Sequence, residues 1–456
     1  TERRSAAPVG LLGLPWDAAA LYAPGLVKSQ QEQSSSLKGA TVYHLALDIA
    51  PDLVHVKGRE EVRYTNREKN ALNEVKFRLF PNIIGGKMTI SNLTLDGQPV
   101  KAAYELSDSV LVVPFSKALQ PGAFATIGMD FELSVPQEAE TNYGVLASLN
   151  NMLTLAHAYP FIPAYDESGW NVEIPSQSGD LTFADASYYV VRVSAPAEAT
   201  LIASGPVVSS EKTGQTQTVL FALGPARDFM LAAAKNYIVV SQTMDEVTVN
   251  SYAPQGETER ARLALEVASE ALKTFGQRYA PYPYTELDVV ATPTLALGVE
   301  YPGLVAIAAR LYSENQINNT PAEIYLESTV AHEVGHQWFY NLIGNDQLDQ
   351  PWLDESLTQF ITWQYYADRY GANAAQGFKE SLEGRWARVD NAKIAVGQPV
   401  AAYTGKEYSA IVYGRGALFF FALRERLGQA KFDAFLKDYV QTYTWNIATT
   451  PGLQTL

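Results

Sequence analysis

The stretch AHEVGHQW (residues 331–338) carries two of the chain's five histidines, His332 and His336, on either side of Glu333. In a helix with about 100° per residue, the two histidines lie about 40° apart and Glu333 about 60° beyond His336. Both imidazoles can therefore bind one metal ion, with a carboxylate beside it to activate a bound water molecule. The alternative is a buried amphipathic helix in which both histidines are core residues. The glutamate at this offset favours a zinc site.

A zinc site needs a third protein ligand, and no histidine follows His336 in the chain. Glu355 follows it after 18 residues, where a second helical pattern begins near Leu353. This interval lets the first helix end near Gly344 and the second helix return beside it. Taken alone, Glu355 would be an exposed carboxylate favoured by the dipole at a helix start. Next to the histidine pair, it is predicted to be the third ligand.

The helix that carries the histidines is predicted to begin at Thr320. This threonine can cap the helix, Pro321 suits the first helical position, and Glu323 completes a Thr-x-x-Glu capping box. These features predict a helix of about 22 residues with His332 about three turns from its start. Upstream, 256–284 has helical spacing, and short strands are predicted at ELDVVATP (286–293) and GLVAIAA (303–309).

The fold class predicted for the chain is multidomain α+β. Residues 1–40 are interpreted as an N-terminal segment with an exposed linker at SQQEQSSS (29–36). Residues 41–249 are rich in β-branched and aromatic residues with frequent turns, which predicts an antiparallel β domain. Residues 250–456 are predicted to form a mainly helical domain with a small sheet. Its last residues, TTPGLQTL, place a helix start close to Leu456, which we interpret as a truncated domain.

Composition limits the classes of function. The net charge of −15 and the absence of a Lys/Arg cluster argue against a nucleic-acid partner. The chain has no cysteine, which excludes thiol catalysis and cysteine zinc sites. No apolar run reaches the roughly 18 residues of a membrane span. A start without Met and the lack of cysteines point to an exported protein (secreted, periplasmic or on the cell surface), with a cytoplasmic location left open.

HEVGHQW followed by WLDES (352–356) resembles the zinc aminopeptidases of the aminopeptidase N and leukotriene A4 hydrolase type. These gluzincins have the pattern HExxH-x18-E, and here Asp354 replaces the asparagine of their Trp-Leu-Asn-Glu motif. The resemblance implies one zinc ion per chain, held by His332, His336 and Glu355, with Glu333 as general base. It also implies a saddle-like N-terminal β domain and a thermolysin-like catalytic domain.

LALGVEYPGLVAI (295–307) resembles the family's Gly-x-Met-Glu-Asn signature. Gly298 and Glu300 are retained, whereas Val299 and Tyr301 replace the methionine and the asparagine. The resemblance implies that Glu300 binds the free α-amine of the substrate, and that the backbone at Gly298 aligns the peptide as an edge strand. A fixed carboxylate near the metal would select a positively charged amino terminus. The alternative for Glu300 is an ordinary loop acid after a strand.

YSAIVYGRGALF (408–419) resembles the family's Tyr-x-Lys-Gly-Ala stretch, with Arg415 at the lysine position. The resemblance implies that Tyr413 donates a hydrogen bond to the developing oxyanion, a task that suits a neutral phenol. Because the chain has 26 tyrosines, only this context distinguishes Tyr413. Tyr408 is the alternative.

The expected function is hydrolysis of the N-terminal residue of peptides that have a free amino terminus. PAYDESGW (163–170) resembles a family stretch that often follows a second amine-binding side chain, but no Glu or Gln lies just upstream of it here. A second anchor must therefore come from elsewhere or be missing. The alternatives are an endopeptidase or an epoxide or other hydrolase with the same metal site, and a catalytically silent peptide-binding relative.

Overall fold

The computed structural model describes residues 10–456 and has two compact units. Unit 1 is β-rich and comprises residues up to Val172 together with Ala186–Tyr237 and Pro283–Glu286. Unit 2 is mainly helical and comprises Glu173–Asp185, Ile238–Tyr282 and Leu287–Leu456. The predicted α+β class is confirmed. After Tyr237 the chain continues in unit 2, because the next two strands join the sheet of that unit.

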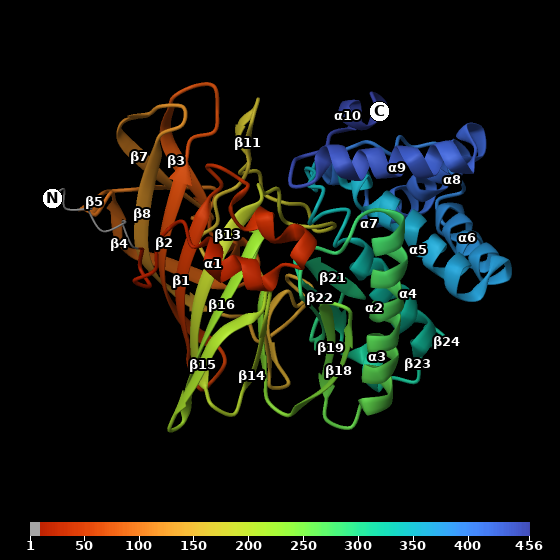
Figure 1. The fold of residues 1–456 in the computed structure, drawn as a ribbon, viewed down its shortest axis with the longest axis horizontal. Coiled ribbons are helices and arrows are strands. Elements are labelled where there is room, and N and C mark those ends of the chain that lie inside the picture. Colours follow the sequence, from red (N-terminus) through yellow and green to blue (C-terminus); the bar gives the residue numbers. More distant parts are fainter. Residues whose placement is uncertain (1–9) are drawn as a thin grey trace. The chain divides into compact units, whose positions relative to one another are not determined.

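An eight-stranded sheet forms the main layer of unit 1 (Figure 1). Along β2 (His55–Thr65), buried residues alternate with exposed or half-buried ones, as expected for a strand with one face on the core. β1 (Val42–Ile49) pairs antiparallel with β2 but parallel with β13 (Ser187–Pro196), so the predicted antiparallel domain contains one parallel pair. In sheet order the other strands are β15 (Val207–Thr213) and β16 (Thr216–Ala226) before β13, and β8 (Phe124–Ser134), β4 (Lys87–Leu95) and β5 (Gln98–Pro99) after β2.

Smaller sheets complete unit 1. One has four strands, another three, and the last is a short hairpin. The four-stranded sheet consists, in order, of β14 (Thr200–Ala203), β17 (Leu231–Ala234), β10 (Met152–Leu155) and β9 (Leu146–Leu149). The three-stranded sheet consists of β3 (Leu72–Arg78), β7 (Val110–Leu119) and β6 (Ala103–Glu105). The hairpin pairs β11 (Tyr165–Asp166) with β12 (Gly169–Trp170). The 3-10 helix η3 (Phe80–Ile83) follows β3.

The N-terminal segment packs on the eight-stranded sheet. It contains α1 (Ala19–Tyr22), η1 (Ala23–Gly25) and η2 (Lys28–Ser35), and the last of these occupies the stretch expected to be an exposed linker. The carbonyl of Gln33 in η2 accepts a hydrogen bond from the Tyr188 hydroxyl at 2.6 Å. Trp16 stacks on the buried His44 of β1 with ring centroids 4.4 Å apart. Residues 1–9 of the predicted segment lie outside the described residues.

Unit 2 has a five-stranded sheet and nearly all of the longer helices. The strands, in sheet order, are β18 (Tyr237–Met244), β19 (Val247–Pro254), β20 (Glu286–Thr292), β22 (Leu304–Ala308) and β21 (Gly298–Tyr301). β21 is therefore an edge strand, antiparallel to β22. The principal helices are α2 (Thr258–Arg278), α4 (Ala322–Gly335), α5 (Glu355–Tyr370), α6 (Ala372–Ala387), α8 (Ala417–Leu427) and α9 (Gln429–Tyr443). α4 packs against α2, α5 and the β21–β22 pair (Figure 1).

Short elements connect these helices. They are α3 (Arg310–Ser313), the hairpin of β23 (Gln316–Ile317) and β24 (Thr320–Pro321), η4 (Pro351–Leu353), η5 (Val400–Ala402), α7 (Gly405–Ala410), the π-helix η6 (Ile411–Gly416) and α10 (Thr450–Gln454). Among residues 10–456, no helix has both the length and the apolar character needed to cross a membrane.

The predicted start of the histidine-bearing helix is wrong. Thr320 pairs with Ile317 in the β23–β24 hairpin, and its side chain does not cap α4. Glu323 lies 3.0 Å from Arg260 of α2 rather than closing a capping box. The helix also ends at Gly335, well before Gly344. Beyond that point the N–H groups of Asn341 and Ile343 bond to carbonyls five residues back, which turns the chain.

Candidate active site

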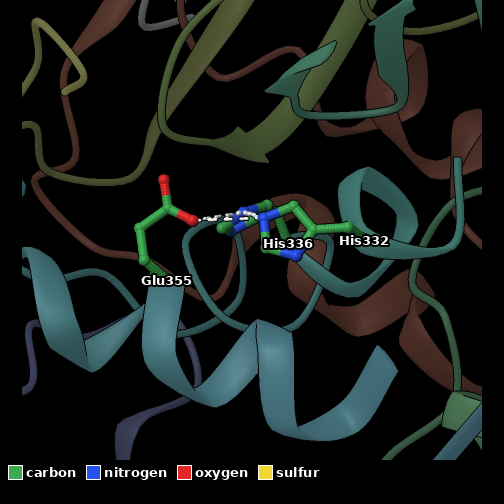
Figure 2. Close-up of side chains that lie close together, drawn as sticks. All are labelled: His332, His336 and Glu355. Carbon is green, nitrogen blue, oxygen red and sulfur yellow. Dashed lines mark hydrogen bonds and ion pairs between the residues drawn. The ribbon is translucent and has the colours of Figure 1, made fainter. Parts of the chain in front are cut away.

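The three predicted metal ligands converge in unit 2. His332 lies in the last turn of α4, His336 is the residue that ends this helix, and Glu355 is the first residue of α5. The two Nε2 atoms are 3.1 Å apart. The Glu355 Oε2 atom lies 3.1 Å from His332 Nε2 and 3.4 Å from His336 Nε2 (Figure 2). All three side chains are buried.

This arrangement fits one zinc ion. Ligands at about 2.0–2.1 Å from a tetrahedral zinc are about 3.3 Å from each other, which matches the three separations. The His336 Nδ1 atom donates to the Phe339 carbonyl at 2.9 Å, so its Nε2 atom faces the centre as a lone pair. Two buried nitrogens and a carboxylate oxygen at this spacing form the expected donor set, and they leave a fourth position for water.

Glu333 lies beside the ligands, between α4 and the edge strand β21. Carboxylate oxygens of Glu333 and Glu300 and a ring nitrogen of His336 all lie within 4.8 Å of one another. Gly298 of β21 makes this approach possible, because a Cβ atom there would be 2.5 Å from Glu333 Oε1. Burial raises the pKa of Glu333 well above its ordinary value, and the charges of Glu300 and Glu355 raise it further.

Glu300 is buried on β21, at the edge of the five-stranded sheet. Its Oε1 atom accepts a hydrogen bond from Gln347 Nε2 at 3.1 Å and lies 4.0 Å from His336 Nδ1. Burial raises the pKa of Glu300 well above its ordinary value, and the nearby Asp180 carboxylate adds to this effect. The structure thus places the predicted amine-binding carboxylate next to the metal ligands, on an edge strand.

Tyr413 reaches the site from the π-helix η6, a rare element that is frequent at functional sites. Its hydroxyl donates to Glu355 Oε1, and its ring centroid is 6.0 Å from that of His332. Tyr408, the alternative, stands edge-on to Tyr413 at 5.6 Å. Burial raises the pKa of Tyr413 well above its ordinary value, with Glu355 adding to the shift, so the phenol is neutral.

The glycines around Tyr413 are explained by close packing. A Cβ atom at Gly414 would lie 3.1 Å from backbone atoms of α6. One at Gly416 would lie 2.1 Å from the Ser356 Oγ atom of α5. The Gly-Arg-Gly context that distinguishes Tyr413 in the sequence therefore reflects how closely the π-helix contacts its neighbours. Arg415 donates to the Ile394 carbonyl.

Gln347 and Asp180 were not among the residues predicted from the sequence, where Asp354 was only a departure from the family pattern. Asp354 Oδ1 accepts from the Glu355 N–H at 2.8 Å and caps α5, while Oδ2 accepts from Gln347 Nε2 at 3.0 Å. Burial, together with the charge of Glu355, raises the pKa of Asp354 to about 8. No motif marks Gln347 or Asp180, so only the tertiary structure identifies them.

Comparison with known proteins supports the same family. Residues 263–455 match the Peptidase family M1 domain and include every predicted site residue. The chain is 26% identical over 370 residues to Aminopeptidase M1-B of Oryza sativa subsp. japonica, covering 76% of this chain and 40% of that protein. It is 28% identical over 281 residues to Aminopeptidase M1 of Arabidopsis thaliana, covering 58% of this chain and 31% of that protein.

The fold is shared with a solved structure, the M1 zinc metallopeptidase from Deinococcus radiodurans. The match has a TM-score of 0.66 at 22% sequence identity and covers 91% of this chain and 89% of that chain. The match of residues 263–455 to the Peptidase family M1 domain and the similarity to named aminopeptidases support the resemblance seen in the sequence. The chain spans less than half the length of the curated plant relatives named above.

Proposed function

We propose that this protein is a zinc metallo-aminopeptidase that removes the N-terminal residue of peptides with a free amino terminus. The observation that carries the proposal is a buried carboxylate, Glu300, on an edge strand next to the metal ligands His332, His336 and Glu355. A solved relative, the Deinococcus radiodurans enzyme, has been crystallised with a Tyr-Ser-Ala substrate. Peptides are therefore the substrates we expect.

The proposed mechanism assigns one task to each side chain. A zinc ion held by the three ligands would supply Lewis acidity, polarising the scissile carbonyl and lowering the pKa of a water molecule. Glu333 takes a proton from the attacking water molecule and passes it to the leaving amine. Tyr413 donates a hydrogen bond to the oxyanion that develops. Glu300 binds the substrate's ammonium group, and the β21 edge aligns the peptide backbone.

The variant Glu333→Gln tests the mechanism. It removes the general base and keeps the shape of the side chain, so zinc should remain bound while turnover falls by about 10²- to 10⁴-fold. Zinc content is measured by elemental analysis, and turnover is measured with aminoacyl fluorogenic substrates. A variant with parental turnover would contradict the assigned role.

N-acetylated peptides test the exopeptidase assignment. If Glu300 binds a free ammonium, the parent protein should cleave a free peptide and leave its N-acetylated counterpart intact. Equal cleavage of both would favour the endopeptidase alternative. Bound zinc without cleavage of either would favour the catalytically silent peptide-binding alternative.

A further inference from the structure

Two cation–π contacts join the end of α6 to the π-helix η6, which carries Tyr413. The Arg385 guanidinium of α6 lies over the Tyr413 ring, 5.6 Å from its centroid. In the opposite direction, the Arg415 guanidinium of η6 lies over the Trp386 ring of α6 at 5.7 Å. Both separations are within the roughly 6 Å over which a cation is attracted to the face of an aromatic ring. Each element therefore places a cation on a ring of the other.

Close packing of the backbones holds Arg385 at this position. A Cβ atom at Gly414, the residue after Tyr413, would lie 3.2 Å from Arg385 Cβ and 3.1 Å from the backbone nitrogen of Trp386. The half-buried Arg385 side chain thus starts beside the backbone next to Tyr413 and ends over its ring. The Tyr413 hydroxyl donates to the predicted ligand Glu355. Tyr413 therefore has a positive charge over its ring and its hydroxyl at the metal ligands.

Arg385 brings a positive charge to a site whose buried acidic groups are Glu300, Glu333 and Glu355. In the part of the chain that the structure describes, it is the only lysine or arginine with an ion pair or cation–π contact to a predicted site residue. It forms no ion pair with any Asp or Glu among residues 10–456. A cation in the last turn of a helix is favourable by itself, but that interaction does not require a ring beneath the guanidinium. The position over Tyr413 indicates a further task.

We propose that Arg385 is a positioning residue that acts through Tyr413, because its charge over the ring orients the phenol and makes the hydroxyl a stronger hydrogen-bond donor to the oxyanion. A positive charge over the ring face draws electron density from the phenol oxygen, and the donated bond strengthens most when the oxyanion forms. Arg385 itself contacts no reacting atom. The inference rests on the proposed aminopeptidase function and adds a residue of α6 to the group that stabilises the oxyanion.

The variant Arg385→Gln tests the proposal. An interaction that strengthens only as the oxyanion develops changes kcat rather than KM. We therefore expect kcat to fall about 5- to 30-fold with KM within about twofold of the parent. Arg385→Lys keeps the charge and should restore most of kcat. Parental kcat in Arg385→Gln would overturn the proposal, as would equal losses in the two variants.

Arg415→Gln is the matched control, because it removes the other cation–π contact of the same interface, whose ring is Trp386. If Arg385 only anchored η6 to α6, the two glutamine variants should lose kcat equally. We expect the larger fall in Arg385→Gln, with Tm measured in parallel to report the loss of anchoring in each. Equal falls in kcat would overturn the proposal and leave Arg385 a structural role.

A double-mutant cycle shows whether Arg385 acts through the phenol. Tyr413→Phe removes the hydroxyl and keeps the ring. In that background, Arg385→Gln should lower kcat by no more than about twofold, because no hydroxyl remains for the charge to strengthen. A fall as large as in the parent would overturn the proposal, since Arg385 would then act independently of the hydroxyl.

Binding of a phosphinic dipeptide analogue separates this inference from the proposed function. The tetrahedral phosphinate resembles the intermediate that carries the oxyanion, and calorimetry on the zinc-loaded protein measures its Kd without turnover. Arg385→Gln should raise this Kd about 5- to 30-fold, but less than about twofold in the Tyr413→Phe background. If the parent cleaves no aminoacyl substrate but shows this coupled change, the role of Arg385 stands and the proposed peptidase function fails. If the parent cleaves such substrates and Arg385→Gln keeps the parental Kd, the peptidase function stands and this inference is overturned.

Discussion

Gln347 uses every hydrogen-bonding group of its side-chain amide inside the site. Nε2 donates to Glu300 at 3.1 Å and to Asp354 at 3.0 Å, and Oε1 accepts from Thr182 at 3.0 Å. The amide is a neutral donor placed between two carboxylates, where a glutamate would add a third negative charge. It connects the proposed amine-binding carboxylate to the residue that caps α5 immediately before the ligand Glu355.

Replacing this amide should therefore weaken substrate binding more than it weakens the metal site. In Gln347→Leu the carboxylates of Glu300 and Asp354 lose their common donor, so we expect KM for free-amine substrates to rise about tenfold while zinc stays bound. Thr182→Val is the matched control, because it removes only the bond to Oε1 and should raise KM less. Steady-state kinetics and metal analysis measure both effects. Parental KM in Gln347→Leu would show that the amide does not position Glu300.

The contrast between these residues shows what the sequence could predict about the site. His332, Glu333 and His336 were predictable because their positions relative to one another follow from the repeat of a single helix. That repeat is visible in the sequence as the spacing of the three residues. Gln347 and Asp180 reach the same site through tertiary contacts from irregular segments. Contacts of that kind leave no periodic pattern, so the sequence alone could not identify them.

At the scale of elements, the site depends on how closely α4 approaches the edge strand β21. Gly298 faces Glu333 and Thr329 of α4, and a Cβ atom there would lie 2.6 Å from Glu333 Cγ and 2.7 Å from Thr329 Cγ2. A separation below about 3 Å between carbon atoms is far inside van der Waals contact. The glycine of the family signature is thus explained by packing against the proposed general base.

The variant Gly298→Ala should therefore lower turnover, because the added Cβ atom would displace the Glu333 side chain. A displacement of about 1 Å in a reacting group can cost on the order of 10²-fold in rate, and we expect kcat to fall by about that factor while zinc content is retained. Gly276→Ala in α2 is the matched control, since nothing lies within 4 Å of its Cβ position. A parental kcat in Gly298→Ala would mean that β21 and α4 can move apart without lowering the rate of the reaction.

Element boundaries were less predictable than element types. Helices and strands in residues 256–309 were predicted from their spacing, and α2, β20 and β22 confirm them. The predicted start of α4 at Thr320 was wrong because Thr320 pairs with Ile317 in a hairpin, and this pairing outweighs its potential to cap the helix. The predicted end of α4 near Gly344 was wrong because the chain turns after His336, and this turn brings Glu355 back to the site. Both errors come from non-local contacts that override local preferences.

At the scale of the whole molecule, all three metal ligands lie in unit 2. A ligand that binds only the folded state stabilises it, by about 4 kcal/mol at roughly 1,000 times its Kd. Removing zinc with a chelator should therefore lower the Tm of the protein. It should also speed amide hydrogen exchange in α4 and α5, while β1, β2 and β8 of unit 1 keep their parental exchange rates.

Hydrogen exchange followed by mass spectrometry can test this localisation, because peptides from the two units are separately resolved. The control is Glu355→Gln, which weakens metal binding by replacing an anionic ligand with a neutral amide, so the chelator should change its exchange pattern less than the parent's. Two results would contradict the prediction. Equal loss of protection in β2 and α5 would mean that the metal stabilises both units together. No change in α4 and α5 would mean that the buried ligands are held by packing alone, without help from the ion.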